Sequence, residues 1–282
     1  MLPLAPKGIE HLLLPAFLLV SGACQAQRDT VTVVSYNIRY DTPQDGADRW
    51  DHRKEALALF VREQRPAVIG LQEVLANQLS DLDTRWPGHA RFGVGRDDGN
   101  AAGEHSPIYY DTARFALAEG RTLWLSPTPD SVSRGWDAAC VRIATWAVLR
   151  DRQRGDSIWV VNTHWDHVGV EARRNSAALL LERLHPVLVA GKDVLLMGDL
   201  NATVEETSVR TLGQFLLSTC PDNRSAEGTY NGFGTVEPPL PRIDHVLISP
   251  TRWQVVAYDV PHPAVNDRQV SDHFPVVVRL LR

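Results

Sequence analysis

The sequence predicts an α/β fold in which β-sheets pack against one another and helices cover them. Two observations carry this prediction. Short apolar runs rich in β-branched residues recur along the chain and end in polar residues, a pattern typical of strands buried on both faces. Helical patterns separate such runs near both ends of the chain, whereas its middle has strand patterns alone.

The apolar runs predict the strands in chain order. Those that stop at, or directly follow, a short polar motif cover residues 31–35, 67–71, 158–161, 194–197, 246–248 and 275–281. Two more, with no helix between them, cover residues 121–125 and 143–149. Because α/β proteins bind ligands at strand ends, the polar motifs are the candidates for a functional site.

Two helices are expected between these strands. Asp51 can cap a helix that carries Leu57, Phe60 and Val61 and ends before Pro66. A second helix is expected over residues 170–189, because apolar side chains recur there at helical spacing. This apolar stripe consists of Leu180, Leu184, Val187 and Leu188.

The composition is that of a soluble globular protein. Of 282 residues, 44% are hydrophobic and 22% are charged, which excludes disorder, collagen and coiled coil. No linker-like stretch interrupts the interior, so we expect one compact domain over residues 28–282. The net charge of −5 argues against a general nucleic-acid coat, although carboxylates gathered around bound cations produce the same balance.

Residues 1–23 have the pattern of a secretory signal peptide. Lys7 precedes an apolar run over residues 12–20, and small residues follow before Cys24. The run is too short to span a bilayer. We therefore expect an exported protein, located in the periplasm or outside the cell. Two outcomes stay open: a lipoprotein anchored to the membrane through Cys24, or ordinary signal-peptidase cleavage nearby.

Polar residues at two strand ends suggest a phosphate or metal site. Asp199 and Asn201 follow a buried strand two residues apart, so both side chains project to the same side if the backbone stays extended. A carboxylate beside an amide suits a hard cation and a phosphoryl oxygen. The run Gly-Asp-x-Asn is also a common turn, Asn37 can equally be a turn residue, and Glu73 can be an ordinary solvated carboxylate.

A histidine and two aspartates add a titratable group to these candidates. Asp272 and His273 precede the last expected strand, and Asp244 precedes another. A histidine held by a carboxylate through one ring nitrogen can present the other nitrogen to a substrate. Adjacent Asp and His also arise by chance, so this pair alone does not identify a site.

Taken in order, the motifs resemble the endonuclease/exonuclease/phosphatase family with the DNase I-like fold. The resemblance covers about residues 31–281 and rests on Tyr36-Asn37, Gln72-Glu73, Asn162-Thr163-His164, Gly198-Asp199-Leu200-Asn201, Arg242-Ile243-Asp244 and Ser271-Asp272-His273. It implies a four-layer α/β sandwich, in which helices flank two packed β-sheets. It also implies a nuclease, phosphodiesterase or phosphatase that depends on Mg²⁺ or Mn²⁺.

The resemblance assigns a role to each motif within a catalytic domain over residues 28–282. Asn37, Glu73 and Asp272 would bind the metal. Asp199 would position or deprotonate the attacking, metal-bound water, although an aspartate with a pKa of about 3.9 is a poor base at pH 7. The roles at the phosphate fall to Asn201, His164 and His273, the last with Asp244 as its partner.

Other residues lie outside the family pattern. We expect Tyr109, Arg142 and Arg173 to help bind the substrate, with ordinary interior or surface positions as the alternative. Cys140 and Cys220 can form a disulfide in an oxidising compartment only if they lie close together, which the sequence does not show.

The substrate is a phosphoester whose alcohol the motifs do not identify. Nucleic acid, a lipid head group and a small organic phosphate all remain. Neither a basic stripe with interleaved aromatic residues nor a basic amphipathic segment favours a polymer or a membrane. No protein partner is implied, and we expect a monomer.

Two alternative functions are open. His164-Trp165-Asp166-His167 resembles half of the zinc motif of metallo-β-lactamase-like hydrolases, but Asn162 stands where the first histidine belongs. A non-catalytic phosphate- or lipid-binding module would lack a ligand, whereas every expected acidic, amide and imidazole position is filled.

Overall fold

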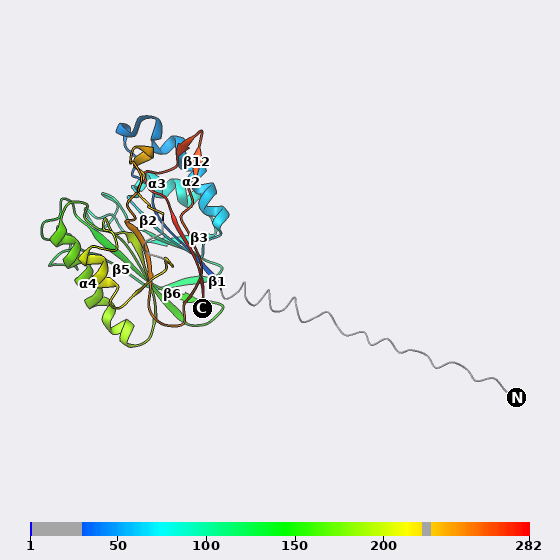
Figure 1. Ribbon diagram of the computed structural model, residues 1–282. Coiled ribbons are helices and arrows are strands. Elements are labelled where there is room, and N and C mark those ends of the chain that lie inside the picture. Colours follow the sequence, from blue (N-terminus) through cyan, green and yellow to red (C-terminus); the bar gives the residue numbers. More distant parts are fainter. Residues whose placement is uncertain (2–29, 222–226) are drawn as a thin grey trace.

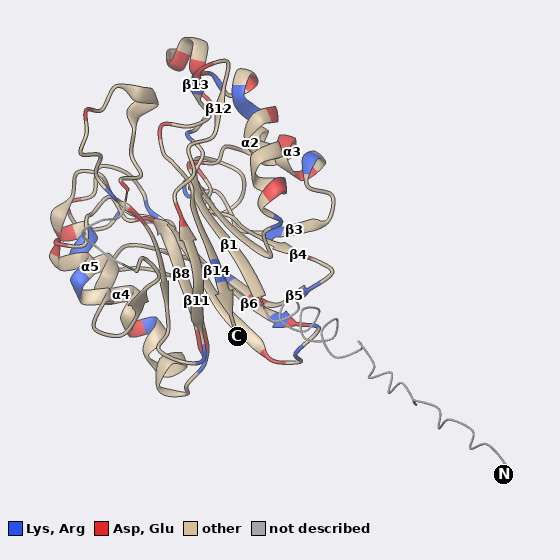
Figure 2. Ribbon diagram, turned by 45° about the vertical axis from the view of Figure 1, so that its right-hand side comes forward, with Lys and Arg blue, Asp and Glu red and all other residues tan. Residues whose placement is uncertain are grey.

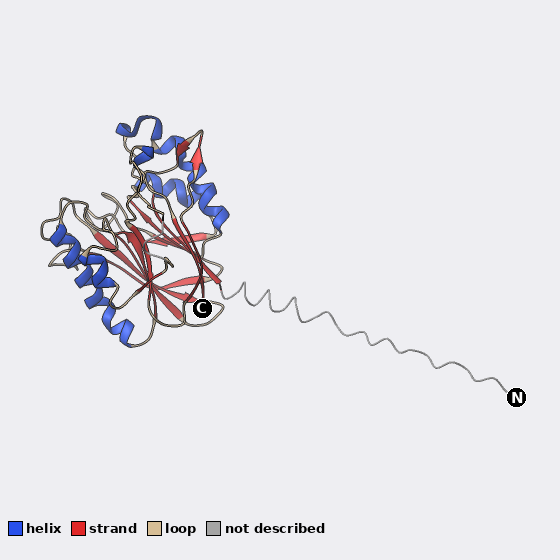
Figure 3. Cartoon of the chain, in the orientation of Figure 1, coloured by secondary structure: helices blue, strands red, loops and turns tan. Residues whose placement is uncertain are grey.

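Two six-stranded β-sheets form the centre of the molecule, and helices cover their outer faces (Figures 1 and 3). This computed structural model describes Met1 and residues 30–221 and 227–282. The expected signal peptide, beyond Met1, and Cys24 therefore lie outside the described residues. Among the described residues, no helix combines the length and apolar character needed to cross a membrane.

The first sheet has the strand order β11-β14-β1-β2-β4-β3. Its strands are β1 (Thr30–Asn37), β2 (Val68–Gln72), β3 (His89–Phe92), β4 (Ile108–Asp111), β11 (Gln254–Asp259) and β14 (Val276–Leu281). β1 pairs in parallel with β2, with Asn37 opposite Gln72, and antiparallel with β14. The carboxyl ends of β1 and β2 therefore meet the amino end of β14 at one edge of the sheet.

The second sheet has the strand order β5-β6-β7-β8-β10-β9. Its strands are β5 (Phe115–Trp124), β6 (Ile143–Asp151), β7 (Ser157–His164), β8 (Asp193–Asp199), β9 (Leu217–Ser218) and β10 (Asp244–Ile248). β7 and β8 are parallel, with His164 opposite Asp199, and the antiparallel β10 places Asp244 opposite Asp199 as well. Three candidate site residues thus meet at one end of this sheet.

Helices complete the four layers. Helices α2 (Trp50–Gln64) and α3 (Ala76–Arg85) cover the first sheet, and α4 (Val170–Val189) and α5 (Thr207–Leu212) cover the second. The shorter elements are the 3₁₀ helices η1 (Pro43–Asp48) and η2 (Gly232–Gly234) and the hairpin of β12 (Ala264–Val265) and β13 (Arg268–Gln269). The bounds of α4 are those expected from its apolar stripe, whereas α2 has Arg49 as its N-cap and Asp51 inside its first turn.

The apolar core lies in three layers, one between the sheets and one under each helical face. Between the sheets, Val33 and Val68 of the first sheet pack with Val160 and Leu195 of the second. These strands are buried on both faces, which explains why their sequences are continuously apolar. The predicted four-layer sandwich is therefore confirmed.

One polar contact crosses the apolar layer between the sheets. The Nε2 of Gln72 donates to the Oδ1 of Asn162 at 2.7 Å, and the Nδ2 of Asn162 donates to the carbonyl oxygens of Leu71 and Pro107. A Cβ at Gly70 would lie 2.7 Å from the Oδ1 of Asn162, so the amide needs a glycine there. This contact joins the two sheets next to Glu73 and His164.

Candidate active site

A cavity of about 540 Å³ lies where the strand ends of the two sheets meet. Both sheets contribute to its lining, which consists of Arg39, Tyr40, Glu73, Arg96, Glu104, Cys140, Arg142, His164, His167, Asp199, Asn201, Tyr230, Ile243, Asp272 and His273. A larger hollow of about 920 Å³ has residues such as Thr30, Asp111 and Arg279 in its lining and includes none of the predicted site residues. The chemistry is therefore concentrated in the smaller cavity.

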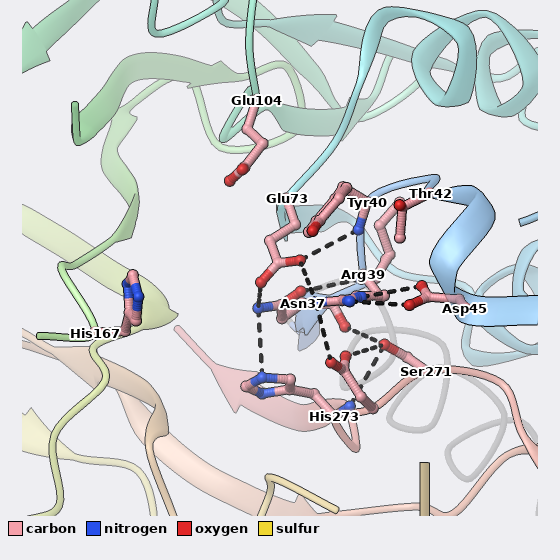
Figure 4. Close-up of polar contacts among 12 residues, drawn as sticks. Asn37, Arg39, Tyr40, Thr42, Asp45, Glu73, Glu104, His167, Ser271 and His273 are labelled. Atoms are coloured by element: carbon pink, nitrogen blue, oxygen red, sulfur yellow. Dashed lines mark hydrogen bonds and ion pairs between the residues drawn. The ribbon is translucent and has the colours of Figure 1, made fainter. Parts of the chain in front are cut away.

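Asn37 connects the two sheets behind the lining of this cavity. Its Nδ2 lies 3.0 Å from the Oε1 of Glu73 and 3.0 Å from the Oδ2 of Asp199, which come from opposite sheets. Its Oδ1 accepts a hydrogen bond from the backbone N–H of Arg39, and its contacts with Glu73 and His273 are drawn in Figure 4. Asn37 is fully buried, so its amide orders the carboxylates around it.

His273 and Asp244 form a buried pair. The Nδ1 of His273 lies 2.8 Å from the Oδ2 of Asp244, and its Nε2 lies 3.6 Å from the Oδ2 of Asp199. Burial alone would lower the pKa of His273, but the negative charges of Asp244 and Asp199 outweigh it and raise this pKa to about 10. The imidazole is therefore cationic at neutral pH and donates to Asp244 through Nδ1.

Asp199 is a buried carboxyl group whose proton affinity is raised. Burial raises its pKa to about 7, and the charge of Asp244 adds to the effect. An aspartate with an ordinary pKa is too weak a base at pH 7. The raised pKa makes Asp199 a better base, because a catalytic base works best when its pKa is near the working pH. Desolvation is the cause, and it arises only in the folded chain.

Asn201 turns back toward His164. Its Nδ2 lies 3.0 Å from the Nε2 of His164 and 2.9 Å from the carbonyl oxygen of Trp165. The backbone of Asn201 has φ +46°, so the extended path expected after Asp199 is wrong; a tight turn brings both side chains to the cavity instead. Burial, with the nearby charge of Arg142, holds the pKa of His164 well below its usual value, so this histidine is neutral.

Glu73 and Asp272 form an acidic side of the cavity. The Oε2 of Glu73 accepts a hydrogen bond from the backbone N–H of Tyr40 at 3.2 Å. The nearest guanidinium is that of Arg39, whose Nη1 lies 4.0 Å from Glu73 and 3.8 Å from Asp272 while the group binds Asp45 at 2.9 to 3.0 Å. Burial raises the pKa of Asp272, and Glu73 raises it further.

The motifs at these strand ends have a match among known protein families. A family model described as the endonuclease/exonuclease/phosphatase family matches residues 34–273. The chain belongs to this family. The protein is therefore a phosphoester hydrolase, and the buried Asp199, Asp244 and His273 group is consistent with its active site.

Solved structures agree with this membership. An endonuclease/exonuclease/phosphatase protein from Bacteroides vulgatus is 35% identical, with a TM-score of 0.84 over 90% of this chain and 99% of that one. The mannosyl-6-phosphatase of Bacteroides thetaiotaomicron is 33% identical, with a TM-score of 0.82 over 89% and 100%. A Danio rerio TDP2 structure with a single-strand DNA product shares the fold at 14% identity, with a TM-score of 0.70 over 90% and 99%. The comparison with curated proteins found no match.

The endonuclease/exonuclease/phosphatase protein can also hold a metal ion in this region. Single ligand atoms of Asp199, Asp244 and His273 lie within 4.8 Å of one another, and an ion bound there would displace the proton of His273. Cys140, Asp166 and His167 meet the same criterion, but the carboxylate of Asp166 already accepts four backbone hydrogen bonds. This second group has little capacity left for an ion, and the zinc hypothesis gains no support from it.

Of the expected substrate-binding residues, only Arg142 lines the cavity. The hydroxyl of Tyr109 donates to Asp83 of α3 on the helix-covered face of the first sheet. Arg173 is held by the carbonyl oxygen of Asp166 and the carboxylate of Glu206. The structure therefore places Tyr109 and Arg173 outside the lining of the cavity, because the strand and helix that carry them direct their side chains elsewhere.

Both described cysteines are free thiols, so the disulfide that the sequence left open is not formed. Cys140 lines the cavity, whereas Cys220 is buried at the end of the second sheet.

The sequence missed three charged residues of the site. Arg39 follows the Tyr36-Asn37 motif by two residues and could have been found from that spacing, but Arg96 and Glu104 lie in a polar, glycine-rich stretch that reads as an ordinary loop.

Proposed function

We propose that the protein is a Mg²⁺- or Mn²⁺-dependent phosphoesterase in which Asn37, Glu73 and Asp272 hold the cation. The carboxylates of Glu73 and Asp272 support this, since hard cations prefer oxygen ligands. Asn37 would add its Oδ1, which in this structure accepts from the backbone N–H of Arg39, so its amide would turn to bind the ion. The single observation that carries the proposal is the acidic side of the cavity, where burial and Glu73 keep the pKa of Asp272 raised although His273 and Arg39 lower it, and where Arg39 approaches the two carboxylates only to 3.8 to 4.0 Å. A cation would relieve this repulsion.

The residues opposite the acidic side would carry out the proton and charge chemistry. Asp199 would remove a proton from the attacking water, because its carboxyl group takes up a proton near neutral pH. The cationic His273, held by Asp244, would donate a hydrogen bond from Nε2 to a phosphoryl oxygen. His164 and Asn201, which both line the cavity, would contact the phosphate. When bound, the metal would supply positive charge for the oxygens that become negative.

The substrate would be a small organic phosphoester. The relative from Bacteroides thetaiotaomicron is described as a mannosyl-6-phosphatase, so a sugar phosphate is the first compound to assay. Acidic and basic residues alternate on α2 and α3, where Lys54 pairs with Asp51 and Asp81 (Figure 2). Such a mixed surface gives no electrostatic track for a long nucleic acid.

Metal removal tests the proposal. We expect hydrolysis of a sugar phosphate to stop after chelation and dialysis and to return with Mg²⁺ or Mn²⁺. We also expect Mg²⁺ to raise the melting temperature of the protein, because a ligand that binds only the folded state stabilises it. Glu73→Gln should abolish both effects, whereas Glu182→Gln, on the exposed face of α4, should preserve them. Undiminished hydrolysis in the chelated, dialysed protein would contradict the proposal.

We further propose that the protein is exported, with the mature chain beginning at or shortly after Cys24. The motivation is the order of Lys7, the apolar run and the small residues. Mass spectrometry of the native protein, after cell fractionation, tests this. An acyl mass on Cys24 would identify the lipoprotein, a shorter unmodified chain would identify ordinary cleavage, and an intact N-terminus in the cytoplasm would exclude export.

A further inference from the structure

The wall of the cavity formed by Arg96 and Glu104 has no role in the proposed hydrolysis. The Nη1 of Arg96 lies 2.6 Å from the Oε2 of Glu104, and the two side chains are only 15% and 17% exposed. Figure 4 shows Glu104 directed into the space between Glu73 and His167. Both residues line the cavity, with Glu104 next to Glu73, and the alcohol part of a bound phosphoester would lie against them.

The loop that carries this pair is tightly ordered. Backbone hydrogen bonds join Arg96 to Glu104 at 3.1 Å and Asp97 to Ala102 at 3.1 Å. A Cβ at Gly95 would lie 2.2 Å from the carbonyl oxygen of Ala102, so the two sides of the loop approach as closely as a glycine permits. Such a loop presents Arg96 and Glu104 in one arrangement, which reduces the entropy lost on binding.

The loop is also attached to the metal-binding side. The backbone N–H of Val74 donates to the carbonyl oxygen of His105, and the N–H of His105 donates back to Val74. Val74 follows Glu73 and His105 follows Glu104 in the chain. The distance between the two glutamates is therefore set by paired backbone bonds, which suits a substrate held at both ends.

The chemistry of this wall suits hydroxyl groups. Arg142 lines it too, and its Nη2 donates to the Nδ1 of His167 at 3.0 Å, so the Nε2–H of His167 is left as a donor. Arg96 and Arg142 donate, whereas Glu104 accepts. Hydroxyl groups both donate and accept, so a wall of this mixed kind can satisfy several of them at once.

The same wall is poorly suited to a nucleobase. Stacking on an aromatic ring is the usual way to hold an unpaired base. Among the described residues that line the cavity, the only Tyr, Phe or Trp rings are those of Tyr40 and Tyr230. Tyr40 packs under the guanidinium of Arg39, and Tyr230 lies 5.0 Å from the ring of His273, so both rings are already packed against other side chains.

We propose that Arg96 and Glu104 bind hydroxyl groups on the alcohol half of the substrate, which makes the protein selective for phosphoesters of small polyhydroxylated alcohols. The inference rests on the proposed hydrolysis of a small phosphoester. A site built to hydrogen-bond hydroxyl groups rejects analogues that lack them, because buried donors such as the Nε of Arg96, which has no hydrogen-bond partner among the described residues, then stay unsatisfied. Selectivity of this kind is directly measurable.

The test compares two primary-alcohol phosphates of similar size, mannose 6-phosphate and cyclohexylmethyl phosphate, with the full-length protein in Mg²⁺. We expect kcat/KM for the sugar phosphate to be at least about 10²-fold higher. In Glu104→Gln and in Arg96→Gln this preference should fall about 10- to 100-fold, the loss expected for one charged hydrogen bond. Glu55→Gln, which removes a matched partner of Arg85 outside the cavity, should keep the preference unchanged.

The outcomes separate this inference from the proposed function. Hydrolysis of neither phosphate would refute the proposed small-phosphoester activity itself. Equal hydrolysis of both by the unchanged protein, or an equal loss on both in the folded Glu104 and Arg96 variants, would overturn the hydroxyl-binding wall and leave the hydrolysis standing. A preference for a dinucleotide over the sugar phosphate would overturn it as well. Thermal melts identify variants that fold.

Discussion

The Oδ2 of Asp199 and the Nε2 of His273 lie 3.6 Å apart in one buried environment. Different effects nevertheless set the protonation states of the two side chains. Burial dominates for Asp199 and raises its pKa, whereas the surrounding carboxylates dominate for His273 and keep it protonated. The result is a weakly acidic carboxyl group beside a stable cation. An arrangement of this kind separates the proton acceptor from the group that holds the phosphate.

The pairing of His273 with Asp244 leads to a prediction about non-additivity. His273→Ala should lower kcat by about 10²- to 10⁴-fold, and Asp244→Asn should lower it somewhat less, because the imidazole then loses its orienting partner. In the double variant, the Asp244 change should add little to the loss already caused by His273→Ala. All three variants would be assayed at saturating Mg²⁺.

His185→Ala, on the exposed face of α4, is the matched control and should keep full activity. Thermal melts would first establish that each variant folds. Losses that simply multiply in the double variant would mean that the two residues act separately. The pair would then have to be abandoned, although the family membership would stand.

At the scale of elements, Asp166 joins the segment after β7 to the segment before β6. Its carboxylate accepts hydrogen bonds from the backbone N–H groups of Ala139, Cys140, Val168 and Gly169. The side chain of Arg142 lies 3.4 Å from it. Asp166 therefore positions the wall that carries Arg142 and His167, although neither side chain belongs to a family motif.

These hydrogen bonds predict how stability depends on pH. Burial alone would raise the pKa of Asp166, but the backbone donors lower it well below its usual range. The folded state therefore favours the charged carboxylate. This stabilisation is complete above about pH 4, the unfolded pKa, and is lost as the pH falls below it towards the folded pKa.

Asp166→Asn should lower the free energy of unfolding by about 1 to 3 kcal/mol at pH 6, the range for losing hydrogen bonds to a buried charge. The difference from the unchanged protein should shrink at pH 3. Urea unfolding at both pH values measures it. Asp130→Asn, at an exposed side chain, is the control and should be nearly neutral. A difference that grows at pH 3 would contradict the assignment.

At the scale of the whole molecule, the site exists because two sheets meet at a defined register. Asn37 ends β1 of the first sheet and Glu73 directly follows β2, whereas Asp199 and His164 belong to the second sheet. Asn162 bridges the sheets through Gln72 and two backbone carbonyl oxygens. The motif Asn162-Thr163-His164 thus combines a structural amide with a histidine of the site.

Asn162→Ala should therefore destabilise the protein by about 1 to 3 kcal/mol, because buried polar groups lose their partners. We also expect a drop in kcat, since the two halves of the site would be less firmly placed. Denaturant unfolding and turnover of a sugar phosphate measure the two effects. Asn175→Ala, on the exposed face of α4, should change neither. Unchanged stability would show that the bridge is dispensable.

The sequence by itself was sufficient for the fold class, for most strands and for α4. Strands buried on both faces must be apolar throughout, and a covering helix needs an apolar stripe, so both leave a local pattern. The sequence was also sufficient to identify the family, because the family motifs adjoin the apolar runs and their order can be read directly along the chain. The Asp51 cap and the extended path through Asn201 were wrong, since caps and turns depend on single backbone angles.

Only the tertiary structure decided which polar residues share the cavity. Arg96 and Glu104 became part of it, while Tyr109 and Arg173 were excluded, because the direction of a side chain depends on what packs against its element. The raised pKa of Asp199 has the same origin. Desolvation and the field of neighbouring charges arise when segments far apart in the chain are brought within a few ångströms, and no local sequence pattern records that approach.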